Sequence, residues 1–104
     1  MTRLFLVKDG ERELWVAALV DEDVWTYVAE TGKFHRNEGA RHDYYFLNEL
    51  EYVEVGIAEA QHRIRAGVGT VDAEEFPDSA QRWREDTEAM DPEIVFASMV
   101  ADLA

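Results

Sequence analysis

A chain of 104 residues fits one domain, and 47% hydrophobic with 12% aromatic residues can build a core. The formal net charge of −13 argues against nucleic acid and anionic lipid as direct partners, because both bind through cationic patches. Without cysteine the chain has no disulfide, thiolate metal ligand or cysteine nucleophile, and we expect a cytoplasmic protein. The longest apolar run, residues 14–20, is too short to cross a bilayer, so no membrane partner is expected.

The N-terminal third predicts three strands. Apolar segments at 3–8 and 13–21 flank Asp9-Gly10, a dipeptide that favours a hairpin because its turn needs positive φ angles. The loop is either this dipeptide alone or residues 9–12. Residues 24–31 alternate aromatic with β-branched side chains, as a third strand of a meander does. We interpret the polar residues 34–43 as a connecting loop.

Residues 44–66 admit two interpretations. Apolar residues recur every three or four positions from Phe46 to Ile64, which indicates one long helix. Gly56 would cost that helix about 1 kcal/mol. The other interpretation is a strand near 51–55 followed by a helix at 57–66, with Gly56 as N-cap, Gly67 after the last turn and Glu59 paired with Arg63. We favour strand then helix, and the long helix stays open.

Two further helices are predicted near the C-terminus. Asp78 or Ser79 can cap a helix that runs through Met90. Residues 91–93 (Asp-Pro-Glu) combine an N-cap residue, a proline at the first helical position and an acid in the first turn, so a last helix is predicted at about 92–103. The whole chain is therefore predicted as a small single α+β domain. Its sheet-forming part is about 3–31 and its helical part about 57–103, and a three- or four-stranded antiparallel sheet carries two or three helices packed on one face.

The last third holds most of the excess negative charge. Residues 67–104 contain ten acidic and two basic side chains. The predicted helix through Met90 partly neutralises itself, because Arg82 and Arg84 lie four positions before Asp86 and Glu88. The unneutralised charge is concentrated at residues 72–78 and at the start of the last helix, and the candidates for partner binding are Asp72, Glu74, Glu75, Asp78, Asp91 and Glu93.

These features predict a non-enzymatic interaction protein whose acidic C-terminal part binds a basic protein partner. An inhibitor, an antitoxin or immunity-type protein and an accessory subunit all fit. A nucleic-acid mimic is an alternative, because carboxylates can imitate phosphates. A homodimer through the apolar stripe of the C-terminal helix stays open.

The rival hypothesis is a small enzyme or ligand-binding domain that uses the polar loop 34–45. This loop is the only locally basic stretch, and its candidate residues are His35, Arg36, Arg41, His42 and Asp43. The histidines lack the i,i+4 spacing of a helical metal site. The serines, Ser79 and Ser98, lie in no nucleophile motif. We therefore predict no catalytic residue, cofactor or metal ion, and we expect the basic residues near 33–41 to contact the acidic C-terminal part of the same chain.

Overall fold

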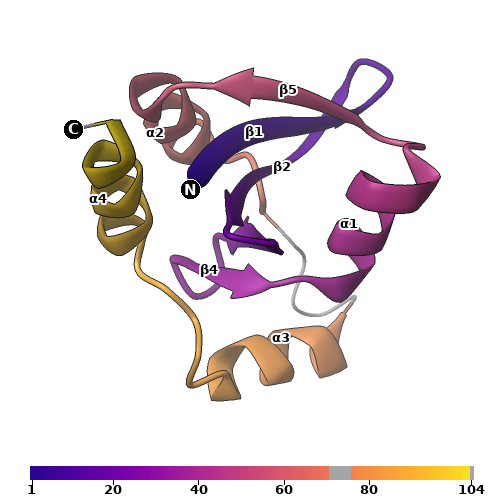
Figure 1. Cartoon of the computed structure of the whole chain (residues 1–104). Helices are drawn as coiled ribbons and strands as arrows, with labels where there is room; N and C mark the ends of the chain where they lie inside the picture. Colours follow the sequence, from indigo (N-terminus) through magenta and orange to yellow (C-terminus); the bar gives the residue numbers. More distant parts are fainter. Residues whose placement is uncertain (71–75, 104) are drawn as a thin grey trace.

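The computed structural model describes residues 1–70 and 76–103, with side chains as far as residue 101. Its centre is a five-stranded antiparallel sheet in the order β4-β3-β2-β1-β5, with helices on both faces (Figure 1). The strands are β1 (Thr2–Asp9), β2 (Arg12–Val20), β3 (Asp23–Val28), β4 (Lys33–Arg36) and β5 (Glu51–Val55). The helices are α1 (Glu38–His42), the π-helix η1 (Asp43–Leu47), α2 (Ile57–Arg65), α3 (Pro77–Glu85) and α4 (Pro92–Leu103). The predicted α+β class is confirmed.

The predicted meander is present. Asp9 pairs with Arg12 across the first hairpin, so Gly10 and Glu11 form the turn. Gly10 has a φ of 63°, and glycine at the first turn position suits the twist of the flanking strands. Neither of the two loops considered, Asp9-Gly10 alone or residues 9–12, is therefore formed, because Asp9 and Arg12 already belong to the strands.

Two parts of the fold differ from the prediction. The sheet has five strands, and the residues interpreted as a loop contain β4 and α1. Phe34 and His35 are both buried and lie on opposite faces of β4, so the strand shows no alternation of apolar and polar residues. The helices also cover both faces of the sheet rather than one, because β1 and β2 carry apolar side chains on both of their faces.

Each face has its own core. On one face α2 and α4 pack over the sheet, and the buried residues are Leu4, Val16, Ala18, Phe34, Ala60 and Val95. On the other face α1 and η1 pack over the sheet, and the buried residues are Phe5, Val7, Ala17, Val24 and Ala40. Within the described residues, no helix is long and apolar enough to cross a membrane.

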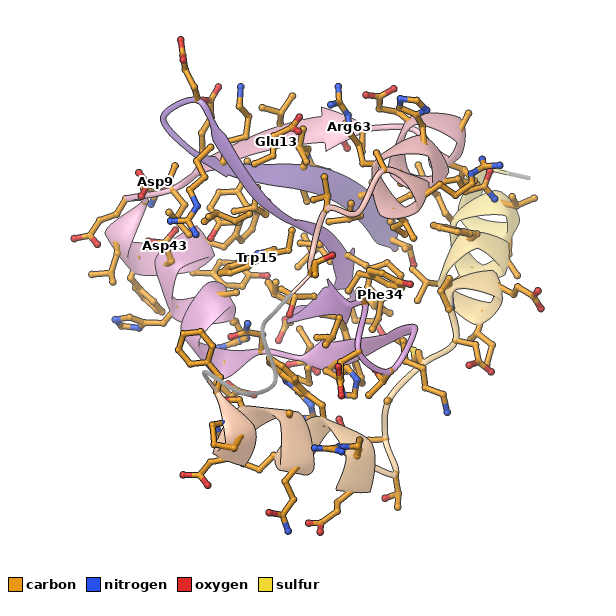
Figure 2. All side chains as sticks on the ribbon, turned by 180° about the vertical axis from the view of Figure 1, so that it is seen from behind. Asp9, Glu13, Trp15, Phe34, Asp43 and Arg63 are labelled. Atoms are coloured by element: carbon orange, nitrogen blue, oxygen red, sulfur yellow. The ribbon has the colours of Figure 1, made fainter. Side chains whose placement is uncertain are left out.

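The segment 44–66 follows the second interpretation, in which a strand precedes a helix. Gly56 is the N-cap of α2, and Gly67 has the positive φ that ends such a helix. The predicted pair is also present, because Arg63 Nε donates to Glu59 Oε1 at 2.8 Å. Arg63 Nη1 further donates to Glu13 Oε1 of β2 at 2.7 Å, which joins α2 to the sheet (Figure 2).

Helix α3 ends earlier than predicted. It stops at Glu85, and the chain then runs along the edge of the sheet instead of continuing as a helix to Met90. Met90 exchanges two backbone hydrogen bonds with Phe34, with N···O distances of 2.8 and 2.9 Å. These bonds cover the β4 edge of the sheet, and edge strands otherwise expose unpaired backbone groups.

Gly69 is a backbone-restricted position. Its φ is 95°, and a Cβ added there would lie 2.8 Å from the Tyr27 carbonyl oxygen. We expect Gly69→Ala to lower the free energy of unfolding by about 1–2 kcal/mol. Gly10→Ala is the matched control, because Gly10 also has a positive φ, 63°, but a Cβ there meets nothing within 4 Å and should change stability less. Urea titration of both variants measures the difference, and equal midpoints would contradict the expectation.

Candidate functional site

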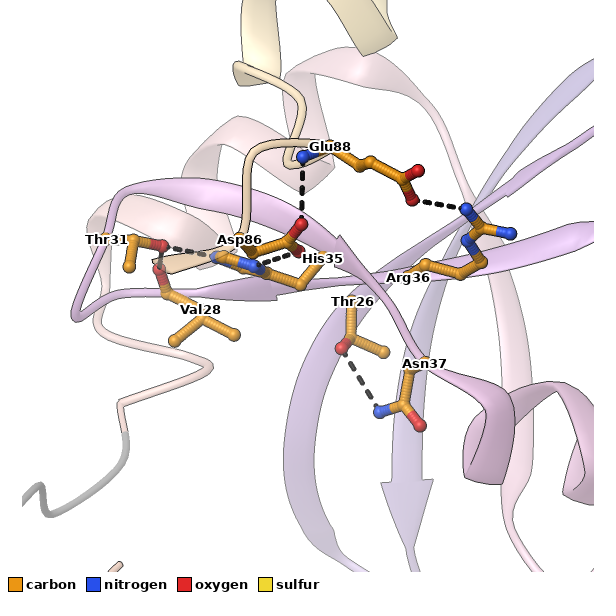
Figure 3. A network of polar contacts seen from close by, with 8 residues as sticks. All are labelled: Thr26, Val28, Thr31, His35, Arg36, Asn37, Asp86 and Glu88. Atoms are coloured by element: carbon orange, nitrogen blue, oxygen red, sulfur yellow. Dashed lines mark hydrogen bonds and ion pairs between the residues drawn. The ribbon is translucent and has the colours of Figure 1, made fainter. Parts of the chain in front are cut away.

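A buried histidine links β4 to the segment that follows α3. His35 is 2% exposed, and its Nδ1 lies 2.9 Å from Asp86 Oδ2 while its Nε2 lies 2.6 Å from Thr31 Oγ1 (Figure 3). The Thr31 hydroxyl also lies 3.4 Å from the Val28 carbonyl oxygen. We call these three side chains the Thr31–His35–Asp86 relay. The relay connects residues 51 positions apart in the sequence.

The relay satisfies His35 in both of its protonation states. In either state Nδ1–H donates to Asp86. When the imidazole is neutral, Nε2 accepts from the Thr31 hydroxyl; when it is protonated, Nε2–H donates to the Thr31 oxygen, whose own proton turns to Val28. The partners also set the pKa of Asp86. Burial would raise it, but hydrogen bonds from His35 and the Glu88 amide hold the pKa of this carboxyl below its ordinary value.

The order hydroxyl, imidazole, carboxylate is also that of a hydrolytic triad. Two observations argue against this use. The His35 ring is buried, and the amides of Thr31 and Gly32 both donate to the Val28 carbonyl, at 3.3 and 2.9 Å, instead of facing a substrate oxyanion. Sequence reasoning considered only serines as hydroxyl nucleophiles and missed Thr31, because its approach to His35 depends on the β3–β4 turn.

A cleft of about 650 Å³ lies between α3 and the end of β4. Its lining includes Thr26, His35 and Asn37, which we call the polar floor, and Trp83 of α3. The volume is in the range of small-molecule pockets. The floor, however, is satisfied internally, because Asn37 donates to Thr26 Oγ1 and accepts from the Ala40 amide. Its polar groups therefore serve the fold.

The predicted contact between the basic stretch and the acidic C-terminal part is confirmed for Lys33 and Arg36 but is wrong for Arg41, which pairs with Asp23 instead. Arg36 of β4 donates to Glu88, and Lys33 Nζ lies 4.0 Å from Asp91 Oδ1 (Figure 3 shows the Arg36 pair). The predicted pairs within one helix, from Arg82 to Asp86 and from Arg84 to Glu88, are wrong. Because α3 ends at Glu85, both carboxylates lie outside it and turn toward β4.

The polar-loop candidates do not converge on one site. His35 and Arg36 belong to β4, whereas Arg41 and His42 belong to α1 and Asp43 begins η1. Arg41 Nε donates to the Glu22 carbonyl, and His42 is exposed against the ring of Phe46. In the described part of the chain, no three His, Asp or Glu side chains are grouped to hold a metal ion.

Asp43 has a structural role at the base of η1. It is 7% exposed and accepts hydrogen bonds from the Tyr52 hydroxyl at 2.7 Å and from the amides of Glu49 and Leu50 at 3.1 and 3.2 Å. The η1 turn closes when the Asn48 amide donates to the Asp43 carbonyl at 2.7 Å, with Asn48 in the left-handed conformation. Asp43 therefore holds η1 against β5 (Figure 2 labels it).

An apolar surface projects from η1. Tyr44 points inward against Phe5, whereas the next three residues point outward, with exposed fractions of 40% for Tyr45, 70% for Phe46 and 52% for Leu47. We call His42, Tyr45, Phe46 and Leu47 the η1 patch. The periodicity of one long helix had placed Phe46 on a buried stripe, and the sequence gives no sign of the π-turn that exposes it.

The acidic candidates are separated in space. Asp72, Glu74 and Glu75 lie outside the described residues. Asp78 is exposed in the first turn of α3, whereas Asp91 and Glu93 are exposed at the start of α4. The chain enters α3 at one end and leaves for α4 from the other (Figure 1). The described candidates therefore form two groups, one at the start of α3 and the other at the start of α4.

Comparison with known proteins gives no relative from which to transfer a role. No family model matches the chain, and neither a curated protein nor a solved structure is significantly similar to it. Its function has to be inferred from its own residues.

Proposed function

We propose that the chain is a non-enzymatic, cytoplasmic interaction protein that binds a basic protein partner. One observation supports this above the others: half of the positive side chains are engaged by the chain's own carboxylates. Among the described residues, five of the ten Lys and Arg side chains form ion pairs with Asp or Glu, namely Arg3, Lys33, Arg36, Arg41 and Arg63. An approaching partner therefore meets a surface dominated by carboxylates.

Distributed negative charge of this kind acts mainly on the rate at which the two proteins meet. It attracts a basic protein over about one Debye length, near 8 Å at physiological salt, and so raises the association rate. The enzyme alternative has less support, because the relay is buried and the polar floor of the cleft has internal partners. Nucleic-acid mimicry also has less support, since the described candidate carboxylates lie at the starts of two separate helices, α3 and α4, and form no continuous ladder.

Salt-dependent affinity capture tests the proposal. The immobilised protein is exposed to an extract of its source organism in about 0.05 M NaCl and then washed with salt up to about 0.5 M. We expect the retained proteins to be basic and to elute as the salt rises. If nothing basic is retained, or if retention is unchanged by salt, the proposal is wrong.

Two charge-matched variants locate the attraction. The first carries Asp78→Asn, Asp91→Asn and Glu93→Gln; the second carries Asp9→Asn, Glu11→Gln and Glu30→Gln at exposed positions elsewhere. Each removes three negative charges. Equal weakening of retention indicates steering by the whole charge, whereas a larger loss in the first variant assigns the contact to the starts of α3 and α4.

A further inference from the structure

We propose that the η1 patch is the docking surface for the partner, and that the partner contributes an apolar side chain flanked by Lys or Arg. This inference rests on the proposed function and adds where contact occurs. Charge alone brings proteins together, but tight interfaces depend on a few apolar or aromatic anchors. The η1 patch supplies such anchors on a rigid base.

The patch is apolar, contiguous and exposed. The His42 ring lies 5.3 Å from the Phe46 ring, and the Tyr45 ring lies 6.5 Å from it, measured between centroids. Phe46 and Leu47 are both more than half exposed. A soluble protein rarely leaves adjoining large apolar side chains in water without an interaction to make. The π-turn that presents them is a geometry often found at functional sites.

The base of the patch is fixed. Asp43 binds three donors beneath η1, and Tyr44 packs its ring against Phe5 and Tyr52, with centroid distances of 5.6 and 5.1 Å. A partner would therefore meet preorganised side chains, which reduces the conformational entropy lost on binding.

The rim of the patch is acidic. Arg41 stacks over Tyr45 at 5.2 Å and reaches Asp23 and the Glu22 carbonyl, so the β2–β3 turn lies one side chain away from the patch. Glu38 lies one turn before His42 on α1, and Glu49 follows Leu47 by two positions. Within residues 21–23 and 37–50, Arg41 is the only Lys or Arg, and it is already paired with Asp23.

This charge pattern selects among occupants. A second copy of the chain would bring two acidic rims together, and nucleic acid or an anionic membrane would bring phosphates to them. A basic protein segment instead places its cations on the rim carboxylates while its apolar residue packs on Phe46 and Leu47. The second copy, nucleic acid and membrane are therefore disfavoured by the same carboxylates.

Selection from a displayed library of random 16-residue peptides, using the whole protein as bait, tests the inference. We expect enriched peptides to combine Lys or Arg with a large apolar residue. Synthetic fluorescein-labelled copies should bind the double variant Phe46→Ser, Leu47→Ser at least tenfold more weakly than the wild type. The control Ile94→Ser, Val100→Ser removes two apolar side chains of α4 that are also more than half exposed, and it should leave the affinity unchanged.

The outcomes separate the two proposals. Basic peptides that bind both variants equally well, or that lose affinity only in the α4 control, would overturn the docking surface and leave the basic partner standing. Enriched peptides without positive charge, or with affinity unaffected by salt, would overturn the basic partner itself. A selection without binders would overturn the docking surface. Because Phe46 and Leu47 are largely exposed, circular dichroism should show native folding of the double variant.

Discussion

Asp43→Ala is expected to lower the free energy of unfolding by about 3 kcal/mol, although Asp43 lies beside an exposed surface. Its carboxylate accepts three hydrogen bonds in a site that is only 7% exposed. Alanine would leave the Tyr52 hydroxyl and the amides of Glu49 and Leu50 without this acceptor. Urea denaturation at pH 7 measures the loss, and a decrease below about 1 kcal/mol would contradict the role given to Asp43.

The destabilisation caused by Asp43→Ala should be smaller at acidic pH. Burial would raise the pKa of Asp43, but the hydrogen bonds from Tyr52 and the two amides outweigh burial and hold it below the ordinary value. A carboxyl with a lowered folded pKa stabilises the protein above its unfolded pKa, near 3.9, and this contribution is lost as the pH falls through the folded pKa. The difference between wild type and Asp43→Ala should therefore be full at pH 7 and decline below about pH 4.

Two variants serve as controls for Asp43→Ala. Tyr52→Phe removes one of the three donors and is expected to cost about 1 kcal/mol. Asp9→Ala removes an exposed carboxylate from the nearby hairpin and should change stability by less than about 0.5 kcal/mol. If Asp9→Ala were as damaging as Asp43→Ala, general charge effects rather than the η1 anchor would explain both.

Elements with a local signal could be predicted from the sequence. Gly10 marks the first hairpin, Gly56 and Gly67 bound α2, and Pro92 begins α4, because each position depends on the backbone preference of a single residue. The α+β class follows from these elements. The bonds between β4 and the chain after α3 have no such signal, since Phe34 and Met90 are 56 positions apart and pair only through their backbones.

The candidate site was predicted less well for the same reason. The basic residues near β4 were expected to meet the acidic C-terminal part, and charge complementarity alone was enough for that. The sequence did not indicate which of these residues would be buried. His35 and His42 look alike in the sequence, yet one lies in the relay and the other is exposed on the η1 patch. Whether each histidine is buried depends on the element that packs over it, which is α3 for His35, and not on its neighbours in the sequence.

Asp86→Ala is expected to lower the free energy of unfolding by about 2 kcal/mol. It removes the acceptor of His35 Nδ1–H, at 2.9 Å, and of the Glu88 amide, also at 2.9 Å. The buried imidazole would then lose its charged partner, and burying an unpaired polar group is costly. As with Asp43, the pKa of Asp86 is lowered, so the difference in stability between the wild type and Asp86→Ala should be full at pH 7 and decrease at acidic pH.

The His35–Asp86 contact should also decide how firmly the segment after α3 is held. In a double-mutant cycle with His35→Phe, we expect a coupling energy of about 1 kcal/mol or more between the two positions. Hydrogen exchange in residues 77–91 should accelerate in Asp86→Ala by a larger factor than exchange in residues 3–28, because the relay and the Arg36–Glu88 pair attach that segment to β4. If the effects of the two single substitutions on stability simply add, or if hydrogen exchange accelerates uniformly throughout the chain, the relay does not act as a local anchor. The segment would then be held by the backbone hydrogen bonds of Met90 and by the packing of Ala80 and Trp83.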